Sequence, residues 1–94
     1  MPYVSVHSPQ FKHLVRYRII KVRLGMNWTQ GKMANALDIS IDQYKKYEYR
    51  SSMPFNIMML FCDVTSTSIE HMADRNATKE EMEYIKTCER QTSP

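Results

Sequence analysis

Residues that cap the N-termini of helices recur along this chain and predict that it folds into a series of short helices. Ser40 and Thr78 are followed three residues later by Gln43 and Glu81, which is the spacing of a capping box. A capping box satisfies backbone N–H groups that the start of a helix would otherwise leave without partners. The chain has only two glycines and four prolines, so few positions suit the tight turns of β-hairpins. These features predict an all-α fold.

Start and stop signals divide the predicted helices. Apolar residues from Val15 to Met26 recur at helical steps, and either Gly25 or Asn27 can take the left-handed conformation that ends this first helix. Residues 1–10 show no helical period, and the last four residues are expected to fray. We expect N-caps at Thr29, Ser40, Ser68 and Thr78, and helices at residues 11–26, 30–37, 41–49, 54–64, 69–73 and about 79–89.

Charge divides the chain into two halves. Residues 11–50 contain nine basic side chains (Lys and Arg) and three acidic ones (Asp and Glu). Residues 51–94 contain four basic and seven acidic side chains. A small chain polarised in this way is typical of a polyanion-binding half joined to a half that faces solvent or a partner. The charge pattern therefore favours nucleic acid as a ligand.

Several classes of protein find no support in the sequence. A run of apolar residues long enough to span a membrane is absent, as is a signal-peptide pattern, so we expect an intracellular protein. Cys62 and Cys88 form no CxxC pair, so we expect ordinary buried or half-buried thiols, no metal and no cofactor. No catalytic constellation is found, and we do not expect an enzyme.

The predicted helices at 30–37 and 41–49 have the form of a helix-turn-helix. The segments Thr29-Gln30-Gly31-Lys32-Met33-Ala34, Leu37-Asp38-Ile39-Ser40, Tyr44-Lys45-Lys46-Tyr47-Glu48 and Met53-Pro54 resemble the Xre/Cro-type, lambda-repressor-like DNA-binding family, over roughly residues 15–74. The resemblance implies a compact five-helix DNA-binding domain with an added C-terminal helix. The implied organisation is a flexible N-terminal arm at 1–10, the helix-turn-helix domain at 11–76, and a C-terminal helix and tail at 77–94 as a candidate dimerisation element.

The sequence departs from the family pattern at two glycine positions. Asp38 stands in the turn, where a left-handed backbone is tolerated by Asp better than by most residues. Arg50 stands after the Tyr-Glu pair, so we expect the third helix to end differently, with the connection to the next helix rebuilt around Ser51 and Ser52. Arg50 would then be free to reach a phosphate.

Helical periodicity separates two faces of the third helix. Tyr44 and Tyr47 share the side expected to be buried, and the opposite side is expected to enter the DNA major groove. There Lys can donate to guanine and Asp can accept from cytosine, although both are also ordinary solvated or dipole-compensating charges. The resemblance implies base reading by Ile41, Asp42 and Lys46 and a phosphate contact by Gln30. The candidate DNA-contacting residues are Thr29, Gln30, Lys32, Ser40, Ile41, Asp42, Gln43, Lys45, Lys46, Tyr49 and Arg50.

The leading functional hypothesis is a sequence-specific DNA-binding transcriptional regulator, a cytoplasmic homodimeric repressor on the nucleoid. One recognition helix reads few base pairs, so useful specificity needs two half-sites of a short palindrome. The fifth helix or the sixth, with Met82, Ile85 and Cys88, could form the dimer interface, or the sixth could pack on its own domain. The alternatives are a DNA-binding antitoxin whose acidic C-terminal half covers a basic toxin, and a protein-interaction adaptor that has lost DNA binding.

Overall fold

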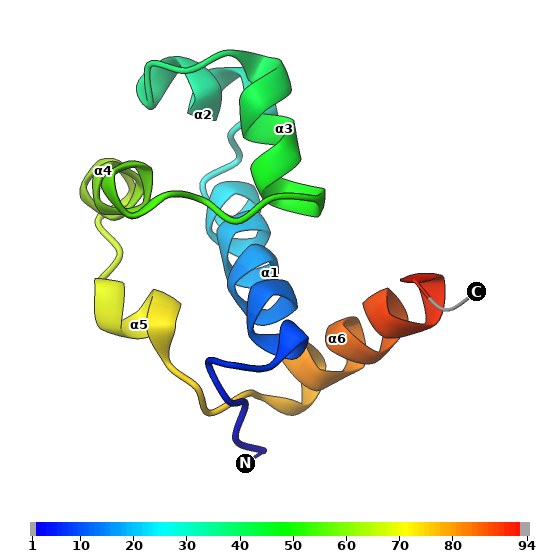
Figure 1. Ribbon diagram of the computed structural model, residues 1–94. Coiled ribbons are helices and arrows are strands. Elements are labelled where there is room, and N and C mark those ends of the chain that lie inside the picture. The colour runs from blue at the N-terminus through cyan, green and yellow to red at the C-terminus, as the bar shows by residue number, and fades with distance from the viewer. Residues whose placement is uncertain (1, 93–94) are drawn as a thin grey trace.

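The computed structural model describes residues 2–92, and these residues form an all-helical fold, as predicted (Figure 1). The long helix α1 lies in the centre, α2 and α3 lie at one end of it, and α4 and α5 lie along one side. Helix α6 packs against α1 on another side. The elements are α1 (Pro9–Gly25), α2 (Gln30–Ala36), α3 (Ile41–Tyr49), α4 (Phe55–Thr65), α5 (Ile69–Ala73) and α6 (Lys79–Thr92).

The predicted caps form and place the helix starts correctly. Ser40 Oγ accepts a hydrogen bond from the backbone N–H of Gln43 at 3.1 Å, and α3 has the predicted bounds. The Thr29 and Ser68 hydroxyls cap α2 and α5 in the same way. Helix α1 begins two residues earlier than predicted because a proline is well suited to the first helical position. Helix α6 extends to Thr92, past the predicted end, so residues 91–92 are helical where fraying was expected. The expectation for residues 93–94 lies outside the described residues.

The main hydrophobic core lies between α1, α2, α3, α4 and α5. Its most buried members include Ile19, Met33 and Phe61, each at most 1% exposed. Tyr44 and Tyr47 belong to the same core, which confirms their prediction as buried residues. Burial of apolar surface stabilises the fold by roughly 25 cal/mol per Å². This core fixes α3 by its inner side and leaves the other side of α3 to solvent.

A second, smaller core joins the N-terminal segment and α6 to α1. It consists of Val4, Leu14, Ala77 and Ile85, all at most 2% exposed. Backbone hydrogen bonds hold the segment there, since the Val4 N–H donates to the carbonyl oxygen of Arg75 at 2.8 Å. The N-terminal segment is thus packed against the rest of the fold at Val4, because removing this apolar side chain from water stabilises the folded chain.

Helix α6 packs on its own domain. Ile85 is fully buried against α1, and Met82 packs against the same small core. Of the two roles considered for the apolar side of this helix, packing within the chain is therefore the one that the structure shows. Cys62 is buried and Cys88 half-buried, as predicted.

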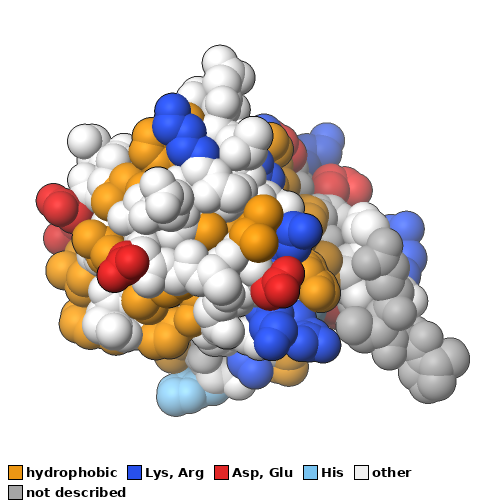
Figure 2. Space-filling view, turned by 90° about the horizontal axis from the view of Figure 1, so that it is seen from above, with side chains coloured by type: hydrophobic (Ala, Val, Ile, Leu, Met, Phe, Trp, Pro, Cys, Tyr) orange, Lys and Arg blue, Asp and Glu red, His pale blue; other side chains and the backbone are white. Residues whose placement is uncertain are grey.

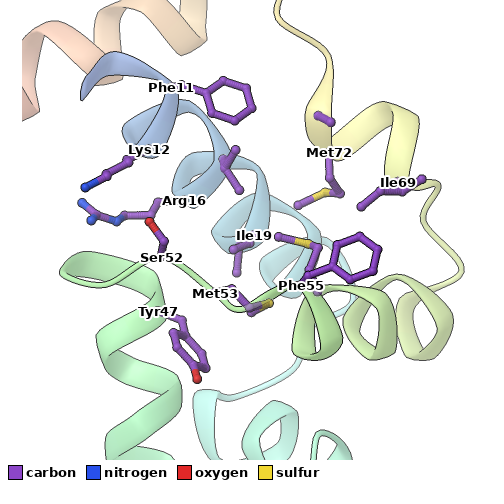
Figure 3. Close-up of a pocket in the computed structure, with 13 residues that line it drawn as sticks. Phe11, Lys12, Arg16, Ile19, Tyr47, Ser52, Met53, Phe55, Ile69 and Met72 are labelled. Carbon is purple, nitrogen blue, oxygen red and sulfur yellow. The ribbon is translucent and has the colours of Figure 1, made fainter. Parts of the chain in front are cut away.

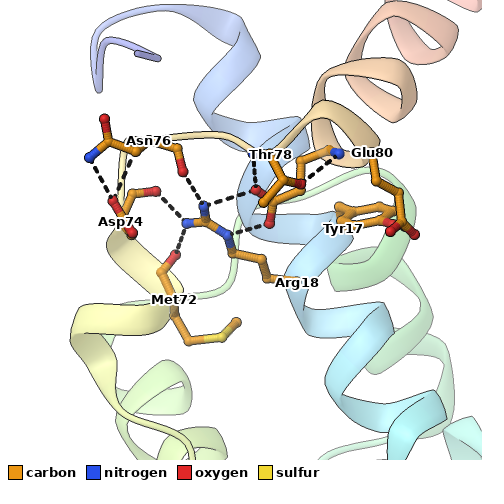
Figure 4. Close-up of polar contacts among 8 residues, drawn as sticks. Tyr17, Arg18, Met72, Asp74, Asn76, Thr78 and Glu80 are labelled. Atoms are coloured by element: carbon orange, nitrogen blue, oxygen red, sulfur yellow. Dashed lines mark hydrogen bonds and ion pairs between the residues drawn. The ribbon is translucent and has the colours of Figure 1, made fainter. Parts of the chain in front are cut away.

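Arg18 ties α1 to the connection between α5 and α6 (Figure 4). Its side chain is 4% exposed, and its Nε donates to Glu81 Oε2 at 2.9 Å. The same guanidinium donates to the carbonyl oxygens of Met72, Asp74 and Asn76. Met72 lies in the last turn of the short helix α5, and Asp74 and Asn76 follow that helix. A single side chain therefore supplies donors to three carbonyl oxygens at the end of α5 and in the connection after it.

The predicted capping box at the start of α6 forms in full. The Thr78 N–H donates to Glu81 Oε1 at 2.8 Å, and the Glu81 N–H donates to Thr78 Oγ1 at 3.1 Å. Burial alone would raise the pKa of the Glu81 carboxyl, but hydrogen bonds from Arg18 and Thr78 outweigh burial and lower that pKa. Glu81 therefore begins α6 and anchors it to α1 at once.

The tight turns use left-handed residues other than glycine. Of the two candidates for the left-handed residue, it is Asn27 that has a positive φ, of 59°, in the turn after α1. Gly25 is still part of the helix. Asp38 has φ of 56°, so this turn survives without glycine, as expected. Ser66 ends α4 with φ of 55°.

Candidate nucleic-acid interface

Helices α2 and α3 form a compact two-helix unit at one end of α1 (Figure 1). The turn between them is closed by backbone hydrogen bonds from Leu37 to Met33 and from Ile39 to Ala34, each at 3.0 Å. Met33 and Leu37 are buried in the main core beneath the unit. The turn and the core therefore hold the two helices at one relative orientation.

The first turn of α3 carries three of the candidate residues at its surface. Ser40 is exposed and caps the helix, and Asp42 is exposed in the first turn. Ile41 is 43% exposed, although a large apolar side chain is usually buried. Gly31 of α2 lies next to it, with Ile41 Cδ1 at 3.5 Å from the position of a Cβ on that glycine. An apolar side chain held in place at a helix start can contact a thymine methyl group.

The outer side of α3 carries the remaining candidates of that helix. Lys45 is exposed, Gln43 and Lys46 are half-buried, and Tyr49 is 63% exposed. The three ion pairs found among the described residues involve neither lysine. The outward side of α3 therefore offers cationic donors, an amide and an aromatic ring on one helix surface.

The start of α2 places Thr29, Gln30 and Lys32 beside α3. Thr29 is exposed, and its hydroxyl caps the helix by accepting from the Lys32 N–H at 3.0 Å. The Lys32 ammonium is also exposed and lies 4.8 Å from the centre of the Trp28 ring, within cation–π range. Gln30 is half-buried, and its Nε2 donates to Glu48 Oε1 at 3.0 Å. That amide nitrogen carries a second hydrogen, which the bond to Glu48 leaves unused.

Glu48 joins α1, α2 and α3, a role that we did not predict. It is 4% exposed and forms a bidentate pair with Arg23, with contacts of 2.6 and 3.2 Å. The Tyr44 hydroxyl and the Gln30 amide donate to the same carboxylate. Arg23 also donates to the carbonyl oxygen of Trp28 at 2.8 Å, which fixes the chain before α2. This network holds the start of α2 against the last turn of α3.

The network keeps Glu48 ionised. Burial alone would raise the pKa of its carboxyl, but hydrogen bonds from Arg23, Tyr44 and Gln30 outweigh burial and lower the pKa below its ordinary value. Burial, followed by the hydrogen bond to Glu48, raises the pKa of Tyr44. In the sequence, the Tyr47-Glu48 pair drew attention to Glu48, but the cationic partner of Glu48, Arg23, is distant along the chain.

Arg50 ends α3 without a left-handed residue. Its φ is −135°, and the N–H groups of Arg50 and Ser51 both donate to the Lys46 carbonyl oxygen at 2.7 Å. Arg16 of α1 donates through Nη2 to the Arg50 carbonyl oxygen at 2.7 Å. Glycine is therefore unnecessary at this position, because the chain leaves α3 with a negative φ and Arg16 satisfies the carbonyl. The Arg50 side chain is exposed, as expected.

The folded chain reduces the charge asymmetry seen in the sequence. The cations Arg18, Lys21 and Arg23 of α1 form ion pairs with Glu81, Glu80 and Glu48, respectively. The basic residues exposed or half-buried in and beside α2 and α3 are Lys32, Lys45, Lys46 and Arg50.

Figure 2 looks onto the end of the molecule that carries these two helices. Basic side chains gather on one side of this face, and hydrophobic, neutral and a few acidic side chains lie around them. Such a mixed surface suits contacts to both phosphates and base edges.

Other kinds of site find little support in the described part of the chain. No group of three or more metal-ligating side chains lies close enough together there to hold a metal ion. No described helix has the length and apolar character needed to cross a membrane.

Comparison with known proteins finds a distant relative. The chain is similar to the transcriptional repressor RstR of the cryptic phage CTXphi, from Vibrio cholerae serotype O1 (strain ATCC 39315 / El Tor Inaba N16961), with 33% identity over 72 residues. The similarity covers 76% of this chain and 64% of the relative, so the chain spans a little under two thirds of the relative's length. No protein-family profile matches the chain, and no solved structure matches it.

Proposed function

We propose that this chain is a sequence-specific DNA-binding transcriptional regulator that inserts α3 into the major groove. The observation that carries the proposal is the compact α2–turn–α3 unit, which presents Ile41, Asp42, Lys45 and Lys46 outward from one helix. The distant similarity to a phage transcriptional repressor supports the same function. We propose that the chain is of the Xre/Cro, lambda-repressor-like kind, with residues 11–76 as its DNA-binding domain.

The proposed contacts divide into base reading and phosphate binding. Ile41, Asp42 and Lys46 read base edges, while Lys45 and the second amide hydrogen of Gln30 contact phosphates. Thr29, Lys32, Ser40, Gln43, Tyr49 and Arg50 complete the interface. The Glu48 network supports these contacts by holding the start of α2 against the last turn of α3.

The active form is proposed to be a homodimer that represses by occupying a short palindrome. Half-sites about 34–36 Å apart would place two copies of α3 in successive major grooves. Since the Ile85 side of α6 is packed on α1, the dimer contact would come from the outer surface of α5 or α6.

The proposal is tested by selecting bound sequences from a randomised duplex library at physiological salt. We expect an inverted repeat with half-sites one helical turn apart, and a protein mass of two chains per duplex in sedimentation. Bound DNA without an enriched motif would contradict sequence-specific reading, and a single chain on each selected duplex would contradict the dimer.

Lysine variants then test the assignment of roles. Lys46→Ala should weaken binding to the selected operator by about 5- to 150-fold, the equivalent of about 1–3 kcal/mol for a base contact, with little loss on random DNA. Lys45→Ala should weaken both and reduce the salt slope by about one. The exposed Lys86 of α6 lies outside the α2–α3 unit and provides a control for phosphate binding, because Lys86→Ala should leave binding to random DNA and its salt slope unchanged. Equal losses for Lys45→Ala and Lys46→Ala on both kinds of DNA would contradict the division of roles.

A further inference from the structure

A cavity lies between α1, α4, α5 and the connection from α3 to α4 (Figure 3). Its volume is about 300 Å³, and its wall is largely apolar, including Val15, Ile19, Met58 and Met72. Phe55, which is 75% exposed, stands at its edge. Pockets that hold small molecules are mostly apolar and begin at about this size. The cavity is separate from the exposed side of α3.

One end of the cavity is cationic. Lys12 and Arg16 lie one helical turn apart on α1, and Figure 3 shows their side chains next to each other, pointing away from Phe11 and Phe55. No acidic side chain lines the cavity. Like charges at this spacing on a helix repel each other, so an anion bound between them would relieve that repulsion.

Arg16 adds a donor that the fold leaves unused. Its Nε is buried and has no hydrogen-bond partner among the described residues, although its Nη2 donates to the Arg50 carbonyl oxygen. A buried donor without a partner is costly, and an acceptor supplied by a ligand removes that cost. The ion pairs among the described residues include neither Lys12 nor Arg16.

We propose that this cavity binds an amphipathic carboxylate, a medium-chain fatty acid of about eight to ten carbons. The alkyl chain occupies the apolar part, and the carboxylate lies between Lys12 and Arg16. A methylene group takes up about as much space as a water molecule, about 30 Å³ in the liquid, so a 300 Å³ cavity accommodates about ten such groups. This proposal stands whether or not the chain binds DNA.

The chemistry distinguishes this ligand from its close analogues. An uncharged alcohol of the same length would fill the apolar part but leave the two cations uncompensated. An alkylammonium would be repelled by them, and acetate would leave the apolar wall without contacts. We therefore expect affinity to fall from decanoate to decanol, and to be lowest for decyltrimethylammonium and acetate.

The experiment is a titration of the ¹⁵N-labelled chain, followed by amide chemical shifts, with each of these four ligands below its micelle concentration. We expect saturable shifts with decanoate, confined to α1, α4, α5 and the connection before α4, and an affinity at least tenfold above that for decanol. Equal binding of decanol and decanoate, the absence of saturation, or shifts scattered over the surface would overturn the proposal.

Variants of the cationic end provide an independent test. Lys12→Gln leaves the fold intact because Lys12 is exposed, and it should weaken decanoate binding several-fold without changing decanol binding. Arg16→Gln should weaken it further, with circular dichroism as the check on folding. Lys86→Gln, which removes an exposed lysine of α6 away from the cavity, should bind decanoate as the wild type does. Wild-type affinity in Lys12→Gln and Arg16→Gln would overturn the proposed position of the carboxylate.

Discussion

Substitution of Arg18 by Met should destabilise the fold more than any other removal of a single positive charge from α1. The substitution leaves the Glu81 carboxylate buried without its cation and removes the donor to three backbone carbonyls. A neutral hydrogen bond contributes about 0.5–1.5 kcal/mol net, and breaking a buried ion pair by removing one partner costs about 3–5 kcal/mol. Because both side chains are at most 10% exposed, solvent screening offsets little of this cost. We therefore expect a loss of about 3–5 kcal/mol.

This loss is large compared with the stability of a small domain, which is about 5–15 kcal/mol in total. Urea unfolding followed by circular dichroism measures it directly. With a dependence of about 1–2 kcal/mol per molar urea, the unfolding midpoint should fall by about 1.5–5 M. Helix α6, which Arg18 anchors through Glu81, should lose amide-exchange protection first.

Lys21 provides the matched control on the same helix. Its ammonium lies 3.5 Å from Glu80, but the two side chains are 55% and 69% exposed. Exposed ion pairs contribute little to stability, so Lys21→Met should leave the midpoint near that of the wild type. Similar midpoints for Arg18→Met and Lys21→Met would refute the argument that burial and the three carbonyl contacts make Arg18 important.

Two further predictions concern stability. Glu48→Gln should cost about 1–2 kcal/mol at neutral pH, because hydrogen bonds to a charged group are stronger than those to a neutral one. Since the folded pKa of Glu48 is lowered, its contribution is present above the unfolded pKa of about 4.3 and is lost as the pH falls through the folded pKa. The difference between wild type and variant in urea unfolding should therefore shrink from pH 7 to acidic pH, and a constant difference would contradict the network. Gly31→Ala should raise the free energy of unfolding by about 0.5–1 kcal/mol, because the added Cβ meets Ile41 only at ordinary contact distance. The thermal midpoint should rise accordingly, and a lower midpoint would contradict this expectation.

Local signals predicted most of the helices. Ser40 and Gln43 are three residues apart, so the capping bond that starts α3 needs no distant partner, and α3 has the predicted bounds. The buried side of α3 followed from the helical repeat, and Tyr44 and Tyr47 are in the core as predicted. The burial of Val4 in the N-terminal segment was not predicted, because no helical repeat marks this residue. Val4 is buried through contacts that include residues far along the chain, Ala77 and Ile85.

The same difference between local and distant contacts holds for the candidate interface. The exposed side of α3 could be predicted because exposure along a helix follows from the helical repeat. The Glu48 network was missed because the interacting residues Arg23, Gln30 and Glu48 lie on three different helices. No spacing in the sequence indicates that such residues meet.

The sequence by itself determined the all-α class, the starts of the capped helices and the side of α3 that faces the core, because all of these depend on residues within one or two helical turns. Only the tertiary structure decided which cations are neutralised, how α3 ends and where α6 lies. Arg18 binds Glu81, and Arg16 satisfies the carbonyl of Arg50, across gaps of 63 and 34 residues. Contacts over such distances in the chain form only after packing brings the helices together, and that packing depends on the whole core.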